Sequence, residues 1–228
     1  MAYKPILFKT PMVQAILESR KTQTRRLAFV ADALREFSCA SYPDGWWYEG
    51  RVYKSFESFV RDCQTPKCKY RPGDILWVRE TWGKLTECNV YPPYEPEEDR
   101  FIYRADIGDP DHFQAKWHPS IHMPKEAARI FLRVKDVRVE RLQDITVLDA
   151  ISEGCDGTIC DHADAHPTLG CTDCLNTGWL EPPDAEFAQL WDTTIKPVDL
   201  NRYGWNANPW VWVIEFEPCE KSEGWPDV

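Results

Sequence analysis

The chain has little positive charge for its size and no long hydrophobic run. Its 228 residues hold 27 lysines and arginines against 37 aspartates and glutamates, a formal net charge of −10. Because each phosphate contact needs a local cation, this balance argues against tight binding to duplex DNA. No apolar run approaches the roughly 20 residues that cross a bilayer, and "MAYKPILFKT" lacks the features of a secretory signal. We therefore expect a cytoplasmic protein without membrane association.

Tryptophan and cysteine, in contrast, are abundant. The chain has 11 tryptophans and 9 cysteines. Tryptophan is large and amphipathic, so these rings either thicken a core or form flat platforms for a planar ligand, and core packing is the expected use of most of them. In the reducing cytosol a disulfide framework is not expected, so a tight cysteine cluster indicates a metal site.

Local patterns predict a mixture of strands and helices. Thr10 followed by Pro11 predicts a helix N-terminus with Thr10 as its cap, and this helix is expected to end near Ser19 or Arg20. Thr146 is expected to cap a short helix that ends at Gly154. Alternating or continuous apolar runs predict strands, and a helical period predicts one more helix. The strands are expected at residues 6–8, 75–78, 100–106, 128–142 and 208–218, and the helix at 184–195.

The order of these elements predicts the fold class. Strands at both ends of the chain with helices between them favour an α+β fold with a barrel-like sheet whose terminal strands pair together. Neither a linker nor an internal repeat interrupts the chain. We therefore expect a single elaborated domain over residues 1–228, with one insertion at residues 28–70 and a cysteine-rich insertion at residues 152–183.

The cysteine-rich insertion carries ligands suited to zinc. In "CDGTICDHADAHPTLGCTDC", Cys171 and Cys174 have the spacing of a tetrahedral half-site. The second pair would be Cys160 with His162, or Cys155 with Cys160. Four protein ligands leave no open position for water, so the predicted zinc is structural and holds together a polar insertion. The alternatives are a loop of free thiols, and a Cys155 that simply packs at the preceding helix end.

The stretch "ESRKTQTRRL", residues 18–27, concentrates one lysine, three arginines and two threonines in an acidic chain. One interpretation is a solvated helix end, where Lys21, Arg25 and Arg26 complement the C-terminal helix dipole. The other is a functional site.

Three segments together bear a family resemblance. "SRKTQTRR", "RPGDILWVRETW" and "RYGWNANPWVWVIEF" resemble the ASCH superfamily, and within it the longer proteins of bacteriophages and prophages. The likeness covers residues 4–27, 68–82, 129–154 and 184–217. It implies a PUA-like β-barrel, RNA or nucleoside chemistry, and a location in the cytosol of a bacterium or a phage-infected host.

The resemblance also implies site residues. The family signature is Gly-x-Lys-x-x-Thr-x-Arg, and this chain has Lys21, Thr24 and Arg26 in register, with Ser19 in place of the glycine. Some small members hydrolyse the amide of N4-acetylcytidine through a lysine, a threonine and a glutamate. By resemblance these roles fall on Lys21, Thr24 and Glu80.

The chemistry of amide hydrolysis is compatible with that trio. It needs a nucleophile, a base to take its proton and an acid to protonate the leaving amine. A buried lysine beside other cations can act as base toward Thr24, and Glu80 at the end of an apolar strand can act as acid. The residues expected to bind substrate are Arg25, Arg26, Arg79, Trp77 and Trp82.

Two functions therefore remain open. The first is hydrolysis of an amide or related bond on a modified nucleoside, and the second is non-catalytic binding of single-stranded RNA, with arginines on phosphate and tryptophans on bases. A ribonuclease is an intermediate possibility, because it would bind RNA and could use the same lysine and glutamate for catalysis. Net acidity favours a small ligand over a long nucleic acid.

Overall fold

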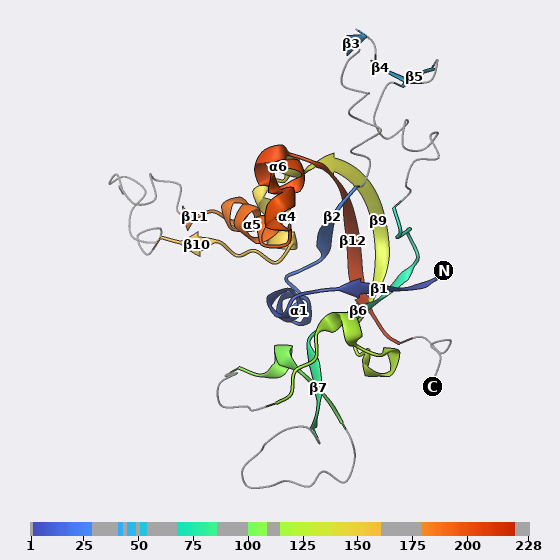
Figure 1. Cartoon of the computed structure of the whole chain (residues 1–228), viewed down its shortest axis with the longest axis vertical. Coiled ribbons are helices and arrows are strands. Elements are labelled where there is room, and N and C mark those ends of the chain that lie inside the picture. The colour runs from blue at the N-terminus through green and yellow to red at the C-terminus, as the bar shows by residue number, and fades with distance from the viewer. Residues whose placement is uncertain are drawn as a thin grey trace. The chain divides into compact units, whose positions relative to one another are not determined.

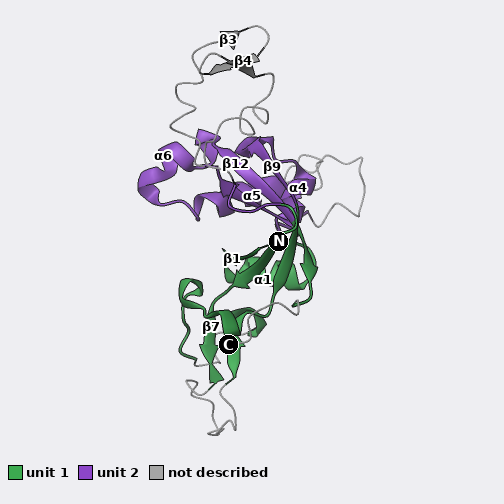
Figure 2. Ribbon diagram, turned by 90° about the vertical axis from the view of Figure 1, so that its right-hand side faces the viewer, with its two compact units in different colours: residues 1–22, 72–135, 216–228 green, residues 23–71, 136–215 purple. Residues whose placement is uncertain are grey.

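The fold is given by a computed structural model of the chain. The structure describes residues 2–28, 41–42, 45–48, 51–53, 68–85, 100–108, 115–160 and 179–221. These residues fall into two compact units, coloured separately in Figure 2. Unit 1 is Met1–Thr22, Pro72–Lys135 and Phe216–Val228, and unit 2 is Gln23–Arg71 and Asp136–Glu215. The prediction of one elaborated domain stays a prediction.

Five strands form the main sheet, in the order β1-β6-β9-β12-β2. β1 (Tyr3–Leu7) runs parallel to β6 (Ile75–Arg79), and β6 is antiparallel to β9 (Phe131–Arg141). β12 (Trp210–Cys219) is antiparallel to β2 (Gln23–Leu27). Figure 1 shows the long strands β9 and β12 side by side. The α+β class is confirmed, but the described strands form an open sheet and not a closed barrel.

The predicted pairing of the first and last strands is wrong. β1 neighbours β6, and β12 neighbours β9 and β2. Side-chain contacts explain the position of β1: Lys4 Nζ lies 2.6 Å from Asp74 Oδ2, and the Ala2 amide donates to Asp74 Oδ1 at 3.1 Å. Asp74 directly precedes β6, so this buried carboxylate fixes the start of β1 against the start of β6.

The structure also contains helices and smaller sheets. Within the described residues the α-helices are α1 (Thr10–Leu17), α4 (Val147–Ser152), α5 (Pro183–Asp192) and α6 (Leu200–Tyr203). Two hairpins pair β7 (Trp82–Lys84) with β8 (Phe101–Tyr103) and β10 (Thr158–Ile159) with β11 (Trp179–Glu181). A third sheet, inside the predicted 28–70 insertion, contains β3 (Ser41–Tyr42), β4 (Gly45–Tyr48) and β5 (Arg51–Tyr53).

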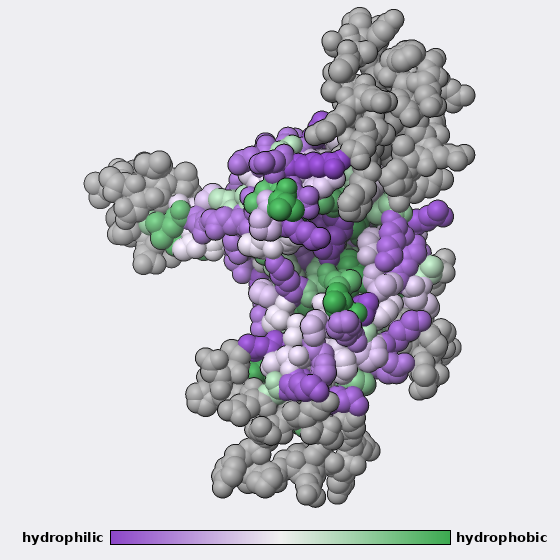
Figure 3. Space-filling view, in the orientation of Figure 1, coloured by the Kyte–Doolittle hydropathy of each residue, from purple (hydrophilic) through white to green (hydrophobic). Residues whose placement is uncertain are grey.

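Single-turn 3₁₀ helices complete the fold, at Arg104–Asp106, Ser120–His122, Lys125–Ala127, Leu142–Asp144, Pro197–Asp199 and Trp205–Ala207. Among the described residues, no helix has the length and apolar character needed to span a bilayer. The described surface in the view of Figure 3 is mostly hydrophilic, with small hydrophobic areas between.

Each unit has its own apolar clusters. In unit 2 a cluster joins α4, α5 and β12, with Phe187, Trp191, Val211 and Val213 among its buried members. In unit 1, Trp77 packs with Ile75 and Phe131, and Trp82 packs with Met123 and Ala127. Trp77, Trp82 and Trp191 are thus core residues, as the composition predicted for most tryptophans.

The helix ends follow the sequence closely. Thr146 caps α4 through a capping box with Asp149, as predicted, and Gly154 follows that helix with a positive φ of 90°. At α1 the cap is Lys9 and not Thr10, which is already helical. The chain leaves α1 through Ser19, whose φ of 60° lies in the left-handed region that favours glycine. The position where the family signature has glycine is therefore a left-handed turn here.

Candidate functional site

Most of the basic stretch is a strand and not a helix end. Helix α1 stops at Leu17 and β2 begins at Gln23, so side chains alternate between the two faces of β2. Gln23 points toward α4, where its amide donates to the Asp149 carbonyl at 2.9 Å. Arg25 shares that face, while Thr24 and Arg26 point to the other face. The alternation therefore separates residues that are consecutive in the motif.

Arg25 is a buried structural cation. Its side chain is 0% exposed, and its guanidinium lies 3.2 Å from Glu140, 3.6 Å from Asp149 and 3.3 Å from Glu153. It also lies over the ring of Phe187, 5.8 Å from the centroid. Three carboxylates and an aromatic face engage this charge, so Arg25 holds β2 against the helices of unit 2. This environment offers a phosphate or substrate no open approach.

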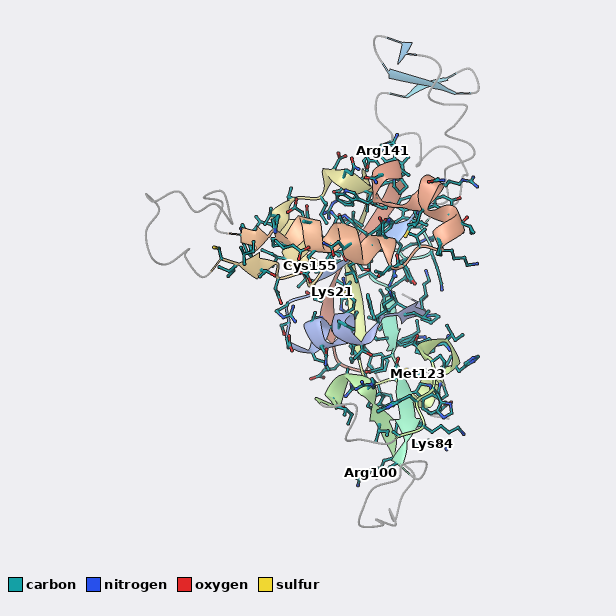
Figure 4. The ribbon with its side chains drawn as sticks, turned by 60° about the vertical axis from the view of Figure 1, so that its left-hand side comes forward. Lys21, Lys84, Arg100, Met123, Arg141 and Cys155 are labelled. Atoms are coloured by element: carbon teal, nitrogen blue, oxygen red, sulfur yellow. The ribbon has the colours of Figure 1, made fainter. Side chains whose placement is uncertain are left out.

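Lys21 is also withdrawn from water. It is 3% exposed, and its Nζ lies 5.6 Å from the centroid of the Phe8 ring, within unit 1. Phe8 in turn packs against Phe216, with ring centroids 6.2 Å apart. Figure 4 shows Lys21 just beyond α1. Because Lys21 and Arg25 are both buried, the interpretation of this stretch as a solvated helix end is wrong.

Among the described acids of unit 1, Glu80 is the most deeply buried, at 1% exposure. Arg129 donates two hydrogen bonds to its carboxylate, from Nε to Oε1 at 2.9 Å and from Nη2 to Oε2 at 3.0 Å. Arg129 also donates to Asp106 at 2.7 Å. Burial raises the pKa of Glu80, the hydrogen bonds and charge of Arg129 lower it, and Asp106 raises it, which leaves the pKa above its usual value.

Tyr103 packs against the arginine of this ion pair. The Arg129 guanidinium lies over its ring, 3.8 Å from the centroid, and the Tyr103 hydroxyl donates to the Ala127 carbonyl at 2.7 Å. Burial raises the pKa of Tyr103 to about 12, against the lowering effect of Arg129, so the phenol stays neutral. Burial lowers the pKa of Arg129, but the hydrogen bonds and negative charges of Glu80 and Asp106 raise that pKa above the ordinary value.

Sequence reasoning missed Arg129, Tyr103 and Asp106. The sequence pattern placed Glu80 at the end of an apolar strand and did not assign Arg129 as its partner. The signal available was the antiparallel pairing of two buried strands: Ile75 pairs with Arg133 and Trp77 with Phe131, so continuing that register brings Arg129 beside the end of β6. Without knowing that β6 and β9 are neighbours, a separation of 49 residues gives no hint.

The aromatic residues predicted to bind substrate are mainly core residues. Trp77 is 5% exposed, and the Arg79 guanidinium lies 5.4 Å from the centroid of its ring. Arg79 also donates to the Ile121 carbonyl. Trp82, 8% exposed, stacks on His118 with centroids 4.7 Å apart and an angle of 26° between the rings. Their predicted contacts with a substrate stay a prediction.

Thr24 and Arg26 share the second face of β2. Thr24 is 4% exposed and stands opposite Ile214 of β12, and Arg26 is half-buried opposite Trp212. Burial lowers the pKa of Arg26, while Tyr70 and Glu153 raise it. Lys21 and Glu80 belong to unit 1, whereas Thr24 and Arg26 belong to unit 2.

Only part of the predicted zinc site falls on described residues. Cys155 is 0% exposed and packs in the apolar cluster of unit 2 with Leu142, Ala150 and Phe187, next to the end of α4 (Figure 4). This position fits the alternative of a packed cysteine. Cys160 is 2% exposed.

The other predicted ligands, His162, Cys171 and Cys174, lie outside the described residues. Within the described part of the chain, no group of three or more His, Cys, Asp or Glu side chains is arranged to hold a metal ion. Zinc therefore stays a prediction.

Comparison of the chain with protein families, with curated proteins and with solved structures found no match.

Proposed function

We propose that the protein hydrolyses an amide or related bond on a modified nucleoside of the N4-acylcytidine kind. The observation that carries the proposal is the burial of Lys21 and Glu80, at 3% and 1% exposure, in unit 1. Lysine and glutamate are almost never fully buried without a specific purpose or partner. These two residues come from the two segments whose joint resemblance to the ASCH superfamily implies a catalytic lysine and glutamate.

The proposed roles follow from the chemistry of each group. Lys21 takes the proton of the nucleophile, for which the resemblance implies the hydroxyl of Thr24. That oxygen attacks the acyl carbon, the C–N bond breaks, and Glu80 donates its proton to the leaving exocyclic nitrogen. Water then hydrolyses the acyl-enzyme ester and releases the carboxylate. A pKa of Glu80 above its usual value supports its role as the acid.

The ion pair between Glu80 and Arg129 sets the orientation of the carboxyl group in this proposal. A carboxylate has about four lone-pair sites and Arg129 uses two of them, so further capacity to bind a proton remains. A PUA-like fold with an open sheet and the membership of the ASCH superfamily remain part of the proposal.

Binding of single-stranded RNA without catalysis is the competing function. It needs cations that face a phosphate backbone, yet Arg25 is fully buried among carboxylates and Lys21 lies against an aromatic ring. These contacts favour the hydrolase over the RNA-binding module and the ribonuclease.

The test compares lysine variants that keep or remove the charge. Lys21→Ala and Lys21→Arg should both lose most turnover of N-acylated pyrimidine nucleosides, because arginine keeps the charge but does not release its proton. Thr24→Ala and Glu80→Gln should also lose at least about 100-fold in kcat. Lys135→Arg, on an exposed residue of β9, is the matched control and should keep full activity.

Product release is measured by chromatography on folded variants, with short RNAs as a second substrate class. A wild-type protein that converts no acylated nucleoside would refute the proposal. Full activity in Lys21→Arg would remove the general-base role, even if hydrolysis were real.

A further inference from the structure

Two carboxylates of unit 1 share one guanidinium. Arg129 donates through Nε and Nη2 to the buried Glu80, and through Nη1 to Asp106 at 2.7 Å. Asp106 ends the 3₁₀ helix at Arg104–Asp106, and Arg129 lies just before β9. With both carboxylates ionised, these three side chains carry one net negative charge, so a single added proton makes them neutral. We call Glu80, Arg129 and Asp106 the shared-arginine group.

The two carboxylates of this group differ in their access to water. The side chain of Glu80 is 1% exposed, whereas that of Asp106 is 47% exposed. A charge costs most where water is excluded, so an added proton goes to Glu80 and Asp106 stays ionised. Burial and the negative charge of Asp106 raise the pKa of Glu80, against the lowering effect of Arg129. The proton therefore resides on the residue that the proposed mechanism uses as its acid.

A protonated Glu80 leaves the charge of Arg129 in need of another anion. The Arg129 side chain is only 26% exposed, so water solvates its charge incompletely. Asp106 supplies the anion at Nη1, on the part of the guanidinium that Glu80 does not use. Without Asp106, Glu80 would be the one carboxylate within ion-pair distance of Arg129 among the described residues. The ion pair would then hold Glu80 in its charged form.

Tyr103 fixes the guanidinium in the position that serves both carboxylates. Its ring lies under Arg129, 3.8 Å from centroid to guanidinium, and its hydroxyl donates to the Ala127 carbonyl at 2.7 Å. Burial raises the pKa of this phenol to about 12, so it adds no charge. The groups that act on Glu80 thus come from three segments: Arg129 before β9, Asp106 after β8, and Tyr103 within β8.

We propose that Asp106 is a positioning residue for the acid Glu80: it holds the charge of Arg129 while Glu80 carries a proton, and so keeps that proton on Glu80. Its part in catalysis rests on the proposed function. In each turnover Glu80 gives the proton to the leaving exocyclic nitrogen. Both carboxylates then share Arg129 until Glu80 takes up a proton from water.

The segment that carries Asp106 is held by other contacts, so its carboxylate can be removed without displacing it. Gln14 of α1 donates to the Ala105 carbonyl at 3.2 Å, and Ala105 is buried. An ion pair of partly exposed groups contributes little to stability. Asp106→Asn keeps the size of the side chain and removes the charge, and it should therefore stay folded.

The test is a ¹³C NMR titration of glutamate carboxyl groups in the full-length protein, with the Glu80 signal assigned by its loss in Glu80→Gln. In Asp106→Asn the titration midpoint of Glu80 should move to lower pH, because Arg129 then favours the charged form of Glu80. Asp106→Glu keeps the charge and should keep the wild-type midpoint. Glu126→Gln removes the same charge from an exposed residue of the 3₁₀ helix at Lys125–Ala127, and this matched control should also leave the midpoint unchanged.

The pH dependence of hydrolysis is the second readout. At pH values above the Glu80 midpoint, Asp106→Asn should lower kcat/KM for an N-acylated pyrimidine nucleoside by roughly two- to fivefold, the size expected for one partly exposed ion pair. Below the midpoint the rate should stay near wild type, because Glu80 is protonated in both proteins. A general loss of folded protein would instead lower the rate at every pH.

The outcomes separate this inference from the proposed hydrolysis. A Glu80 midpoint that is the same in Asp106→Asn as in wild type, or that moves as far in Glu126→Gln, would overturn the inference. A shifted midpoint in a protein that converts no acylated nucleoside would support the hold of Asp106 on the Glu80 proton while refuting the hydrolase. Turnover that Asp106→Asn lowers equally at all pH values would overturn the role of Asp106 and leave hydrolysis standing.

Discussion

Glu80 experiences two opposing influences, because burial favours its neutral form and Arg129 favours its charged form. Arg129→Gln would leave a buried carboxylate without its partner, and such a loss costs about 3–5 kcal/mol at neutral pH. Since the pKa of Glu80 is raised, the folded state holds its proton more tightly than the unfolded state. The contribution of Glu80 to stability is therefore present at low pH and is lost as pH rises through the folded pKa.

Removal of Arg129 takes away the largest lowering influence on that pKa, so the pKa of Glu80 should rise further. We expect Arg129→Gln to be more destabilising at pH 7.5 than at pH 5, because the lower pH favours the neutral form of Glu80. Urea unfolding at both pH values measures this difference. Lys135→Gln, on an exposed pair with Glu217, should change stability by less than about 0.5 kcal/mol. Equal losses at both pH values in Arg129→Gln would contradict the expectation.

Arg25 provides a second prediction at the residue scale. Arg25→Gln leaves Glu153, whose side chain is only 4% exposed, without its cation, and should cost about 3–5 kcal/mol in urea unfolding. The exposed Arg202→Gln should cost less than about 0.5 kcal/mol. A stable Arg25→Gln that had lost nucleoside binding would return Arg25 to its predicted binding role.

At the scale of elements, the turn between α1 and β2 determines which motif residues share a face. Ser19 takes a left-handed conformation at φ 60°, and its amide donates to the Ile16 carbonyl at 3.0 Å. Lys21 follows while still bonded to the end of α1, its amide donating to Ala15 at 3.0 Å, and the alternation of β2 then starts at Gln23. Because of this turn, the motif residues after Lys21 follow the two-residue alternation of a strand and not the 3.6-residue period of a helix.

Ser19→Gly should stabilise the protein by up to about 1 kcal/mol, because glycine adopts φ above zero without a steric cost. Ser19→Val should destabilise it by about 1–2 kcal/mol, because a β-branched residue is poorly suited to this conformation. Urea unfolding measures both. Ser152→Gly, at the last residue of α4, is the matched control and should be destabilising, by at most the roughly 0.5–1 kcal/mol that glycine costs in a helix interior. A loss of stability in Ser19→Gly similar to that in Ser152→Gly would disprove the role of the left-handed turn.

At the scale of the whole molecule, two compact units share one chain. The boundaries between the units fall just before β2, just before the turn that leads into β6, within β9 and within β12. The predicted zinc belongs to this scale, because its ligands would cross-link the insertion at residues 152–183 and stabilise its fold. Purified protein should contain about one zinc per chain, and chelation should increase proteolysis within residues 152–183. Elemental analysis and limited proteolysis test this, with cleavage elsewhere in the chain as the internal control. Protein free of metal, with unchanged cleavage after chelation, would remove the zinc site.

The local features of the fold were predictable from sequence because short-range rules govern them. The helix cap at Thr146, the strand β6 and the long strand β9 each depend on residues a few positions apart. In β12 the sequence alternates Trp210, Trp212, Ile214 and Phe216 with Val211, Val213 and Glu215, which predicts one face made of the first four residues. The structure buries Val211 and Val213 as well as Ile214 and Phe216, and leaves Trp210 and Trp212 half-buried.

The sequence by itself determined the α+β class, the presence of strands β6, β9 and β12 and of helices α1, α4 and α5, and the three candidate residues Lys21, Thr24 and Glu80. These follow from residue type, spacing and the resemblance of two motifs. The tertiary structure alone decided the strand order, the pairing of β1 with β6, and the partners of each buried charge. Arg129 reaches Glu80 across 49 residues, and Arg25 meets Glu153 across 128. Such pairings depend on which strands become neighbours, and the burial of apolar surface over the whole chain determines that.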